Sequence, residues 1–419
     1  MIAYFLTDHR WHCLIGIPFI MGLAWALSPR RIRVQLRTIF VALAMLFVLG
    51  ICMLRVNMGQ YIVARIGDGV SYLNQAADSG IQFVFGDLAL ATSPVGFIFA
   101  IRVLPMIVFF GALMQLLYYL GIIPFCVRAI NKIVRPLLGT SGSETACVIA
   151  NSVLGQTEAP LLVRNYLAQM TSSELFLIMT AGMGTLSGAI VAVYAAMGIP
   201  VVHLLASSVM SIPASIVIAK LMQPEENLRN VEEELTPLPG QDSLLGALGQ
   251  GTMDGLQLAV AVGAILISYI GLMKLFDMML HDVTVYVRLI MHWFGMNFSF
   301  PDLSLSWFFG LCGTPFAWLL GLSGVDASVG AHLWGLRIAA NEMVAYRELV
   351  ASAVSSRALI LLTYALCGFA NISSIGIQIS SIGTLAPSQR PSLAAFGFRA
   401  MLGGVLANAL TACVVGLIL

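Results

Sequence analysis

The chain has 419 residues, of which 59% are hydrophobic and only 10% are charged, and its mean hydropathy is +0.92. Soluble globular domains carry about 25% charged residues, so this composition excludes a soluble protein and indicates one that spans a membrane. The formal net charge of +1 gives no sign of nucleic-acid binding.

The N-terminal region contains two apolar segments joined by an arginine-rich loop. Cys13–Leu27 is followed by the stretch SPRRIRVQLR, and Thr38–Leu54 comes next. Because short positively charged loops stay in the cytoplasm, we expect the N-terminus to lie outside. Arg55–Gly86 is amphipathic and too rich in charge for a span, so we expect it to be an interfacial or external helix.

A third apolar segment, Val95–Val127, leads into Arg128, Lys132 and Arg135, which places its far end in the cytoplasm. Pro136–Asn165 follows. This segment is moderately apolar, rich in Gly and Ser, and broken near its middle, with arginines on both sides. Since both of its ends are basic, they should lie on the same side of the membrane. We therefore expect a re-entrant hairpin that enters and leaves through the cytoplasmic face.

The middle of the chain alternates apolar spans with more polar segments. Leu175–Ile199 and Val201–Ala219 are expected to cross the membrane outward and back. Gln223–Asp242 is clearly hydrophilic and is expected to be a cytoplasmic linker. Gly255–Met273 then crosses outward, and Asp277–Asp302 is expected to be an interfacial helix.

The C-terminal region holds a second broken, glycine-rich stretch, Leu303–Glu348, and two spans, Ala358–Gln378 and Ala400–Leu419, which leave the C-terminus outside. The expected fold is an all-α polytopic membrane protein with about eight transmembrane helices, two re-entrant hairpins of opposite orientation, and interfacial helices. The expected units are the N-terminal helices 1–94, a single span 95–128, a first repeat 129–222, a linker with one span and an interfacial helix 223–302, and a second repeat 303–419.

The two halves of the chain repeat one order of features: a hairpin with a glutamate, a span interrupted by small polar residues, and a final span. Glu158 precedes the interruption GMGTLSG, and Glu342 precedes GFANISSIG. The spacings agree, because 27 positions separate Glu158 from Thr185 and 29 separate Glu342 from Asn371. The first hairpin enters from inside and the second from outside, so the repeat is inverted. Inverted repeats with broken helices are typical of secondary transporters.

Glu158 and Glu342 need an explanation in a chain with so few charges. A carboxylate at membrane depth is costly and usually functional, and each backbone group freed by a broken helix must be satisfied by protein, water or ligand. A bound ligand would meet both needs. The alternative is structural, with the glutamates near the headgroups or in ion pairs with Arg164 and Arg347.

Three segments resemble signature regions of the concentrative nucleoside transporter family: GQTEAPLLVRNYL, NEMVAY and LTYALCGFANISSIG. The resemblance runs from about Val95 to the C-terminus, with the order and spacing of the elements intact. It implies a bacterial cytoplasmic-membrane protein that imports uridine and related nucleosides by symport, with no cofactor. It also implies a homotrimer in membrane lipid, in which each protomer has a scaffold and a mobile transport domain built from the two hairpins and their partner helices.

The resemblance also implies a substrate site. A uracil-like base presents donors and acceptors along one edge, which Gln and Thr can meet directly and Glu through water. Two vicinal ribose hydroxyls are donors, and a carboxylate makes stronger, charge-assisted bonds with them. The residues at the family's nucleobase positions are Gly155, Gln156, Thr157, Glu158, Ile190 and Phe369, and those at its ribose positions are Glu342, Asn371 and Ser374. For Ser373, Ser380 and Ser381, ordinary helix packing is expected.

The sodium-coupled members of this family hold Na⁺ with an asparagine, a serine or threonine, and backbone carbonyls. The corresponding residues here are Asn151, Leu154, Thr185 and Leu186. All of them offer neutral oxygen ligands, which suit a hard monovalent cation. Na⁺ is therefore the expected coupling ion, and the alternative is a proton carried on an intramembrane carboxylate.

Base preference and function class leave alternatives open. Many family members have a hydroxyl residue immediately before the position of Ile190, whereas this chain has Ala189, so the preference for purines or pyrimidines is undecided. A passive channel is the nearer rival to a transporter. An intramembrane enzyme is not expected, because the chain has no His-Glu-x-x-His pattern and none of its six histidines lies beside a paired acid in a span.

Overall fold

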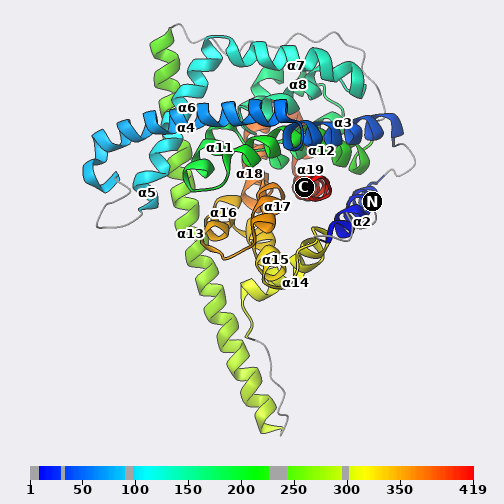
Figure 1. Cartoon of the computed structure of the whole chain (residues 1–419), viewed down its shortest axis with the longest axis vertical. Coiled ribbons are helices and arrows are strands. Elements are labelled where there is room, and N and C mark those ends of the chain that lie inside the picture. The colour runs from blue at the N-terminus through cyan, green and yellow to red at the C-terminus, as the bar shows by residue number, and fades with distance from the viewer. Residues whose placement is uncertain (1–8, 30–33, 90–97, 226–242, 295–301) are drawn as a thin grey trace.

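The computed structural model describes residues 9–29, 34–89, 98–225, 243–294 and 302–419. Within these ranges every regular element is a helix, as the all-α fold requires (Figure 1). Five stretches of the described chain are long and apolar enough to cross a membrane: Leu36–Leu54, Phe99–Tyr119, Ser172–Ala196, Val201–Met222 and Pro387–Ile418. The total of about eight spans stays a prediction.

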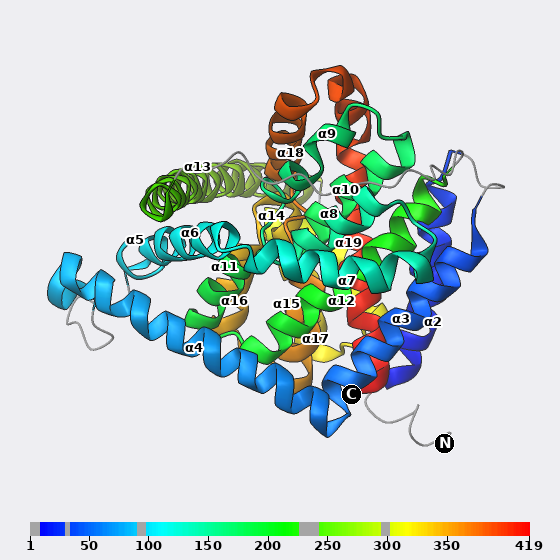
Figure 2. The same ribbon diagram turned by 90° about the horizontal axis from the view of Figure 1, so that it is seen from above.

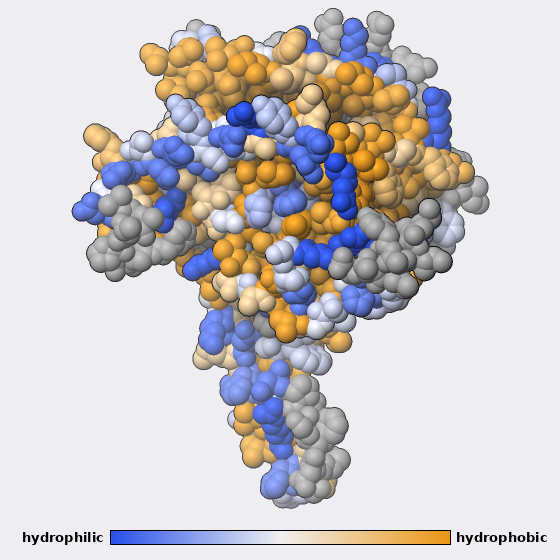
Figure 3. All heavy atoms as spheres, in the orientation of Figure 1, coloured by the Kyte–Doolittle hydropathy of each residue, from blue (hydrophilic) through white to orange (hydrophobic). Residues whose placement is uncertain are grey.

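The N-terminal region forms α2 (Arg10–Ala26), α3 (Leu36–Leu54), α4 (Asn57–Phe85) and the 3-10 turn η3 (Gly86–Ala89). α4 runs along one side of the molecule, as the view from above shows (Figure 2). Only four of its 29 residues are buried. A band of hydrophilic side chains follows it across a largely apolar face (Figure 3). These features fit the amphipathic helix expected over Arg55–Gly86.

The expected single span Val95–Val127 is wrong. In the described part, which resumes at residue 98, α5 (Phe99–Arg102) and α6 (Leu104–Tyr119) form the apolar segment, and α7 (Ile122–Leu138) is a separate helix. The break occurs because Gly121 has a φ of 77°, a left-handed conformation that glycine reaches without strain. α7 is amphipathic, since it buries one apolar stripe and carries the basic residues of this region.

The interfacial helix expected at Asp277–Asp302 is also wrong. α13 (Leu244–Trp293) runs unbroken for 50 residues, or about 75 Å, whereas a hydrocarbon core is about 30 Å thick. Between residues 272 and 293 the sequence has no glycine or proline to end the helix. The N-terminal part of α13 packs along α6, and its far end stands clear of the other helices (Figure 1). Residues 226–242 of the expected linker lie outside the described residues.

The rest of the described chain contains two series of helices in the same order. The first series is α8 (Gly142–Asn151), η4 (Ala159–Val163), α9 (Arg164–Leu167), α10 (Ser172–Gly184), α11 (Gly188–Ala196) and α12 (Val201–Met222). The second is α15 (Gly324–Ala339), α16 (Glu342–Ala351), α17 (Ser356–Leu366), α18 (Ile372–Leu385), η5 (Pro387–Gln389) and α19 (Arg390–Ile418). In each series a helical hairpin precedes a broken helix and then a long helix. The breaks, at 185–187 and 367–371, fall at the interruptions expected from the sequence.

The hairpins differ from expectation in their boundaries. Pro136 belongs to α7, so the first hairpin begins at Gly142 rather than at residue 136. The sequence predicts the second hairpin over Leu303–Glu348, but α14 (Leu305–Leu319) is a separate helix, and the hairpin is formed by α15 and α16. α14 therefore takes the place in the second series that α7 takes in the first. The re-entrant insertion of the hairpins and their opposite orientation stay predictions.

The two helix breaks lie against each other. Gly368 follows the end of α17 with a φ of 103°, and a Cβ atom there would lie 2.6 Å from the carbonyl oxygen of Met183 and from the carbonyl carbon of Gly184. Glycine alone fits so close an approach. The long helices α12 and α19 pack on these half-helices and are themselves largely buried. The broken helices and the long helices therefore form one packed unit.

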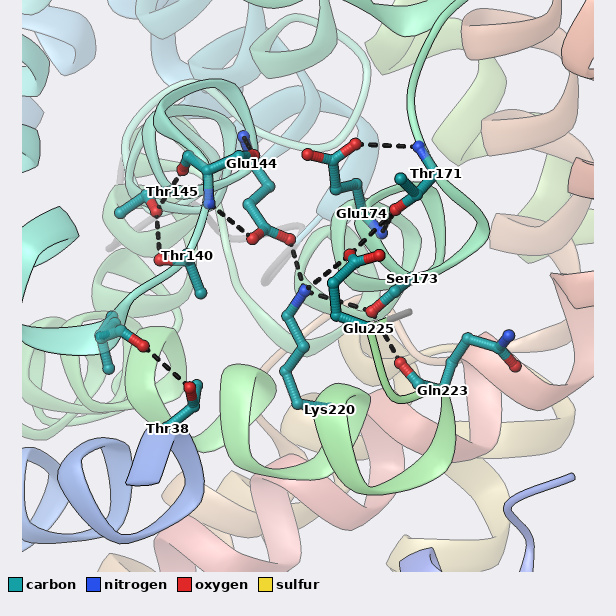
Figure 4. A network of polar contacts seen from close by, with 12 residues as sticks. Thr38, Thr140, Glu144, Thr145, Thr171, Ser173, Glu174, Lys220, Gln223 and Glu225 are labelled. Carbon is teal, nitrogen blue, oxygen red and sulfur yellow. Dashed lines mark hydrogen bonds and ion pairs between the residues drawn. The ribbon is translucent and has the colours of Figure 1, made fainter. Parts of the chain in front are cut away.

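A buried ion network joins the starts of α8 and α10 to the end of α12 (Figure 4). Glu144 and Glu174 each close a capping box at the first turn of their helices. Lys220 Nζ donates to Glu144 Oε2 at 2.7 Å and to Ser173 Oγ at 3.2 Å, and it lies 3.7 Å from Glu225 Oε2. One lysine thereby ties the base of the first hairpin to the two helices that follow it.

Lys220→Met is expected to destabilise the protein by about 3–5 kcal/mol, because removing one partner of a buried ion pair leaves an uncompensated charge. Thermal unfolding of the purified protein in detergent should show a lower midpoint. Lys220→Met combined with Glu144→Gln should recover much of this loss, since it removes the main unpaired carboxylate. A single variant that unfolds at the wild-type temperature would contradict the role assigned to Lys220.

Candidate functional site

A cavity of about 130 Å³ lies between the two hairpin turns, the two helix breaks and one side of α13. It brings together all nine residues predicted to bind substrate, together with Leu154 of the predicted ion site. The lining residues are Leu154, Gly155, Gln156, Thr157, Glu158, Ser187, Ile190, Leu258, Ala261, Val262, Asn341, Glu342, Met343, Phe369, Asn371, Ser373, Ser374 and Ile377. The two repeats thus contribute to one site.

The first hairpin turn is held by close contacts to the break between α10 and α11. The Gly188 N–H donates to the Val153 carbonyl at 2.9 Å. Gly155 has a φ of 110°, and a Cβ atom on it would lie 3.0 Å from Ser187 Cβ. The turn therefore needs glycine at this position, and the contact fixes where the polar side chains of residues 156–158 stand.

Gln156 is held in one orientation by Gln378 of α18. Gln378 Nε2 donates to the Met179 carbonyl at 3.2 Å and to Gln156 Oε1 at 3.1 Å. Since a backbone carbonyl can only accept, it must meet the amide nitrogen of Gln378, and that nitrogen then meets the oxygen of Gln156. The amide nitrogen of Gln156 is left to face Ser374 Oγ, 3.4 Å away. The site therefore presents a hydrogen-bond donor here.

Glu342 begins α16 and is buried. Its Oε1 accepts from the Tyr194 hydroxyl at 2.9 Å, and its Oε2 accepts from Asn371 Nδ2 at 3.0 Å. Asn371 is fixed in turn, because its Oδ1 accepts from the Ser374 N–H at 3.0 Å and from the Ser373 hydroxyl at 2.7 Å. A carboxylate has about four lone-pair sites, so Glu342 keeps acceptor capacity toward the cavity.

The predicted ion ligands do not all face the cavity. Asn151 is fully buried at the end of α8, and neither atom of its amide has a hydrogen-bond partner among the residues that the structure describes. Such an unmet group costs about 1–3 kcal/mol. Thr185 is 1% exposed and donates its hydroxyl to the Ala181 carbonyl at 2.8 Å, which leaves its oxygen able to coordinate. Neutral buried oxygens of this kind fit a hard monovalent cation.

Ion pairing, one of the two structural alternatives for the glutamates, is not supported by the described part of the chain. There, neither Glu158 nor Glu342 forms an ion pair with Arg164 or Arg347. Arg347 instead lines a separate cavity between α13 and the second hairpin. Both glutamates line the central cavity, where a ligand can reach them.

Several residues of the site were not predicted from the sequence, three of them polar residues that hydrogen-bond to predicted ones. Tyr194 lies four residues after Ile190 on α11, and Gln378 lies four residues after Ser374 on α18. Residues four apart share a helix face, so this spacing could have identified both. Ser373, for which ordinary packing was expected, lines the cavity and donates to Asn371.

Known families match almost the whole chain. Residues 15–88 match the model described as the Na⁺ dependent nucleoside transporter N-terminus, residues 100–201 the model described as nucleoside recognition, and residues 203–416 the Na⁺ dependent nucleoside transporter C-terminus. An uncharacterized transporter of Haemophilus influenzae is 38% identical over 413 residues, 96% of each chain. The nucleoside permease NupC of Helicobacter pylori is 32% identical over 415 residues, also 96% of each chain.

Solved structures of one transporter resemble this fold in two states. CNTnw in an inward-facing, substrate-bound state superimposes with a TM-score of 0.88 at 33% identity, over 97% of this chain and 98% of that one. A double variant of CNTnw in an outward-facing state gives a TM-score of 0.89 at 33% identity, over 98% of each chain. The likeness in fold therefore extends over almost the whole chain.

Proposed function

The chain belongs to the concentrative nucleoside transporter family, and we propose that it imports nucleosides such as uridine by symport with Na⁺ moving down its gradient. Family membership makes it an integral membrane transporter of nucleosides and not an enzyme. Alternating access is supported by the inward- and outward-facing states of CNTnw. The proposal includes a homotrimer in the bacterial cytoplasmic membrane with both termini outside.

The main observation behind the proposal is that a hydrogen-bond acceptor, Glu342, and a hydrogen-bond donor, Gln156, line the same cavity. On one side, Glu342 is held by Tyr194 and Asn371 with acceptor capacity to spare, which suits the vicinal hydroxyls of a ribose. On the other side, Gln156 presents an amide N–H₂, which suits the acceptors on the edge of a nucleobase. Ile190 and Phe369 add apolar surface to the cavity.

Na⁺ coupling is supported by the unmet amide of Asn151 and the hydroxyl oxygen of Thr185. A cation held there, with help from the carbonyls of Leu154 and Leu186, would give Asn151 Oδ1 the partner that it lacks among the described residues. Asn151 ends the first helix of the hairpin whose turn carries base-side residues of the cavity. Ion binding would therefore order the substrate site, which is the coupling that symport needs.

Counterflow and uptake of labelled uridine, cytidine, adenosine and guanosine in proteoliposomes test the proposal. With an inward Na⁺ gradient, we expect uridine to accumulate above its external concentration, and without Na⁺ we expect no accumulation. A passive channel would only equilibrate uridine. A proton symporter would accumulate it in choline medium when a pH gradient is imposed. The same assay decides the purine or pyrimidine preference.

Gln378→Leu is expected to weaken uridine binding roughly three- to tenfold. Without Gln378, the Gln156 amide can turn its oxygen toward the base, which removes one hydrogen bond to the base. Such a hydrogen bond contributes about 0.5–1.5 kcal/mol. Isothermal titration of the purified protein measures the change. Gln389→Leu is the matched control, since within the described part of the chain Gln389 Nε2 donates only to the Ala168 and Met170 carbonyls, and Gln389 does not line the cavity. Wild-type affinity in Gln378→Leu would show that Gln378 does not position Gln156.

A further inference from the structure

Arg337 is a fully buried cation that the proposed substrate site does not use. It lies in the last turn of α15 and is 0% exposed. Its guanidinium donates to the carbonyl oxygens of Ala365 and Cys367, the latter at 3.2 Å, and to Oδ1 of Asn408. Burying a charge costs several kcal/mol unless hydrogen bonds compensate it. The contacts of the two terminal nitrogens of Arg337 provide that compensation at one defined place, while its Nε has no partner among the described residues.

That place is the C-terminal end of a half-helix. α17 ends at Leu366, ahead of the break in the second repeat. The last carbonyls of a helix have no partners in a following turn, and they carry the negative end of the helix dipole. A cation is favoured at such an end, and Arg337 supplies one from the neighbouring hairpin.

The first repeat has an asparagine near the end of the corresponding hairpin helix, and that helix contacts α10. Asn151 is the last residue of α8, which holds the position in the first repeat that α15 holds in the second. Asn151 precedes Glu158 by seven residues, and Arg337 precedes Glu342 by five. The half-helix α10 ends at Gly184, just as α17 ends at its break. One repeat therefore has an unmet amide near the end of its first hairpin helix, and the other has a guanidinium near the end of its own.

Asn408 of α19 bridges the two half-helix ends. Its Oδ1 accepts from Arg337, and its Nδ2 donates to the Gly184 carbonyl at 2.6 Å and to Ser211 Oγ at 3.3 Å. The ends of α10 and α17 thus belong to one buried polar centre. The fixed positive charge of Arg337 at the end of α17 therefore lies in the same polar centre as the end of α10, where the Na⁺ site is proposed.

We propose that Arg337 is a built-in cation at the second repeat's counterpart of the Na⁺ site, and that it limits the chain to one dissociable cation per nucleoside. This inference rests on the Na⁺ symport proposed above. Each repeat then holds a cation near the end of its first half-helix, Na⁺ in the first repeat and the guanidinium in the second. Na⁺ is released in every transport cycle and the guanidinium is not, so only the first repeat contributes to coupling.

The number of charges moved with each uridine tests this inference in the wild type. Proteoliposomes with fixed Na⁺ and uridine gradients are set to a series of membrane potentials, and the potential at which net uridine flux reverses gives the charge per uridine. We expect a single charge. A value of two would overturn the inference and leave Na⁺ symport standing. Uridine flux that does not depend on Na⁺ would overturn both.

Arg337→Gln tests the role of the guanidinium itself, because it removes the charge and keeps an amide that can donate to the same carbonyls. We expect a second Na⁺ to bind in place of the charge. The Hill coefficient for Na⁺ in uptake should rise from about one toward about two, the limit set by the number of sites, and the charge per uridine should double. A variant that folds and keeps the wild-type Na⁺ dependence would overturn the inference.

Arg337→Lys is the matched control, because it keeps a positive charge in the same helix position. It should retain a single charge per uridine and a Hill coefficient of about one. A second Na⁺ in the lysine variant would overturn the inference. Should the glutamine variant fail to fold, the wild-type count and the lysine variant decide the question without it.

Discussion

Glu342→Gln is expected to weaken the binding of uridine roughly ten- to hundred-fold. Hydrogen bonds to charged groups contribute about 1.5–3 kcal/mol, and each 1.4 kcal/mol changes an affinity about tenfold. The carboxylate accepts from Tyr194 and Asn371, one on each oxygen. Glutamine would turn an N–H₂ group toward one of these donors and offer no charge to the ribose hydroxyls. Isothermal titration with uridine in Na⁺ measures the loss.

Two comparisons separate recognition of the ribose from a general loss of binding. 2′,3′-Dideoxyuridine lacks both hydroxyls, so the Glu342→Gln protein should hardly distinguish it from uridine. Glu348→Gln makes the same chemical change on α16, where the carboxylate pairs with His332 at 3.0 Å outside the central cavity, and it should leave the affinity unchanged. Equal binding of uridine and dideoxyuridine by the wild type would show that Glu342 does not hold the ribose.

The helix breaks and the hairpin turns could be predicted because their signals are local. Small polar residues within an apolar run mark the breaks at 185–187 and 367–371, where backbone groups lose their helical partners. An acid such as Glu158 or Glu342 stands out in a chain with so few charges. Signals of this kind need no knowledge of the tertiary fold.

Contacts between distant segments could not be predicted in this way. Arg337 reaches carbonyls 28 and 30 residues away and an amide 71 residues away, and nothing in the stretch GLRIA distinguishes a buried arginine from one at a hairpin end. Gln378 likewise orients Gln156 across 222 residues. These pairings follow from how the two repeats interlock, which only the three-dimensional arrangement determines.

The predicted helix boundaries were wrong where charged residues were taken to mark the end of a membrane-spanning helix. Asp277 and the charges that follow it suggest a surface helix, but charged residues are compatible with helix, and α13 continues to Trp293 because no glycine or proline interrupts it. Gly121 shows the reverse case. A single glycine with a positive φ ends α6 inside an apolar run that reads as one span.

Asn151→Ala and Thr185→Ala are each expected to raise the Na⁺ concentration for half-maximal uridine uptake roughly ten- to hundred-fold. The reason is that an oxygen ligand lost from a cation resembles a lost hydrogen bond to a charged group, about 1.5–3 kcal/mol. Because both variants need more Na⁺, they should lose most of their initial uptake rate at a fixed, limiting Na⁺ concentration. The driving force itself is large: one charge crossing ~100 mV carries about 2.3 kcal/mol, enough for a roughly fifty-fold uridine gradient. Initial rates in proteoliposomes across a Na⁺ series measure the shift.

Thr180→Ala is the matched control for the threonine variant, because Thr180 is also fully buried on α10 and its hydroxyl has no hydrogen-bond partner among the described residues. Thr180 lies outside the helix break, so the Na⁺ dependence of uridine uptake by the Thr180→Ala variant should equal that of the wild type. If Asn151→Ala and Thr185→Ala also keep the wild-type Na⁺ dependence, the ion does not bind at the first break. Uptake that persists in choline medium and follows a pH gradient would instead assign the coupling to a proton on an intramembrane carboxylate, and Asn151 would then need a different explanation for its unmet amide.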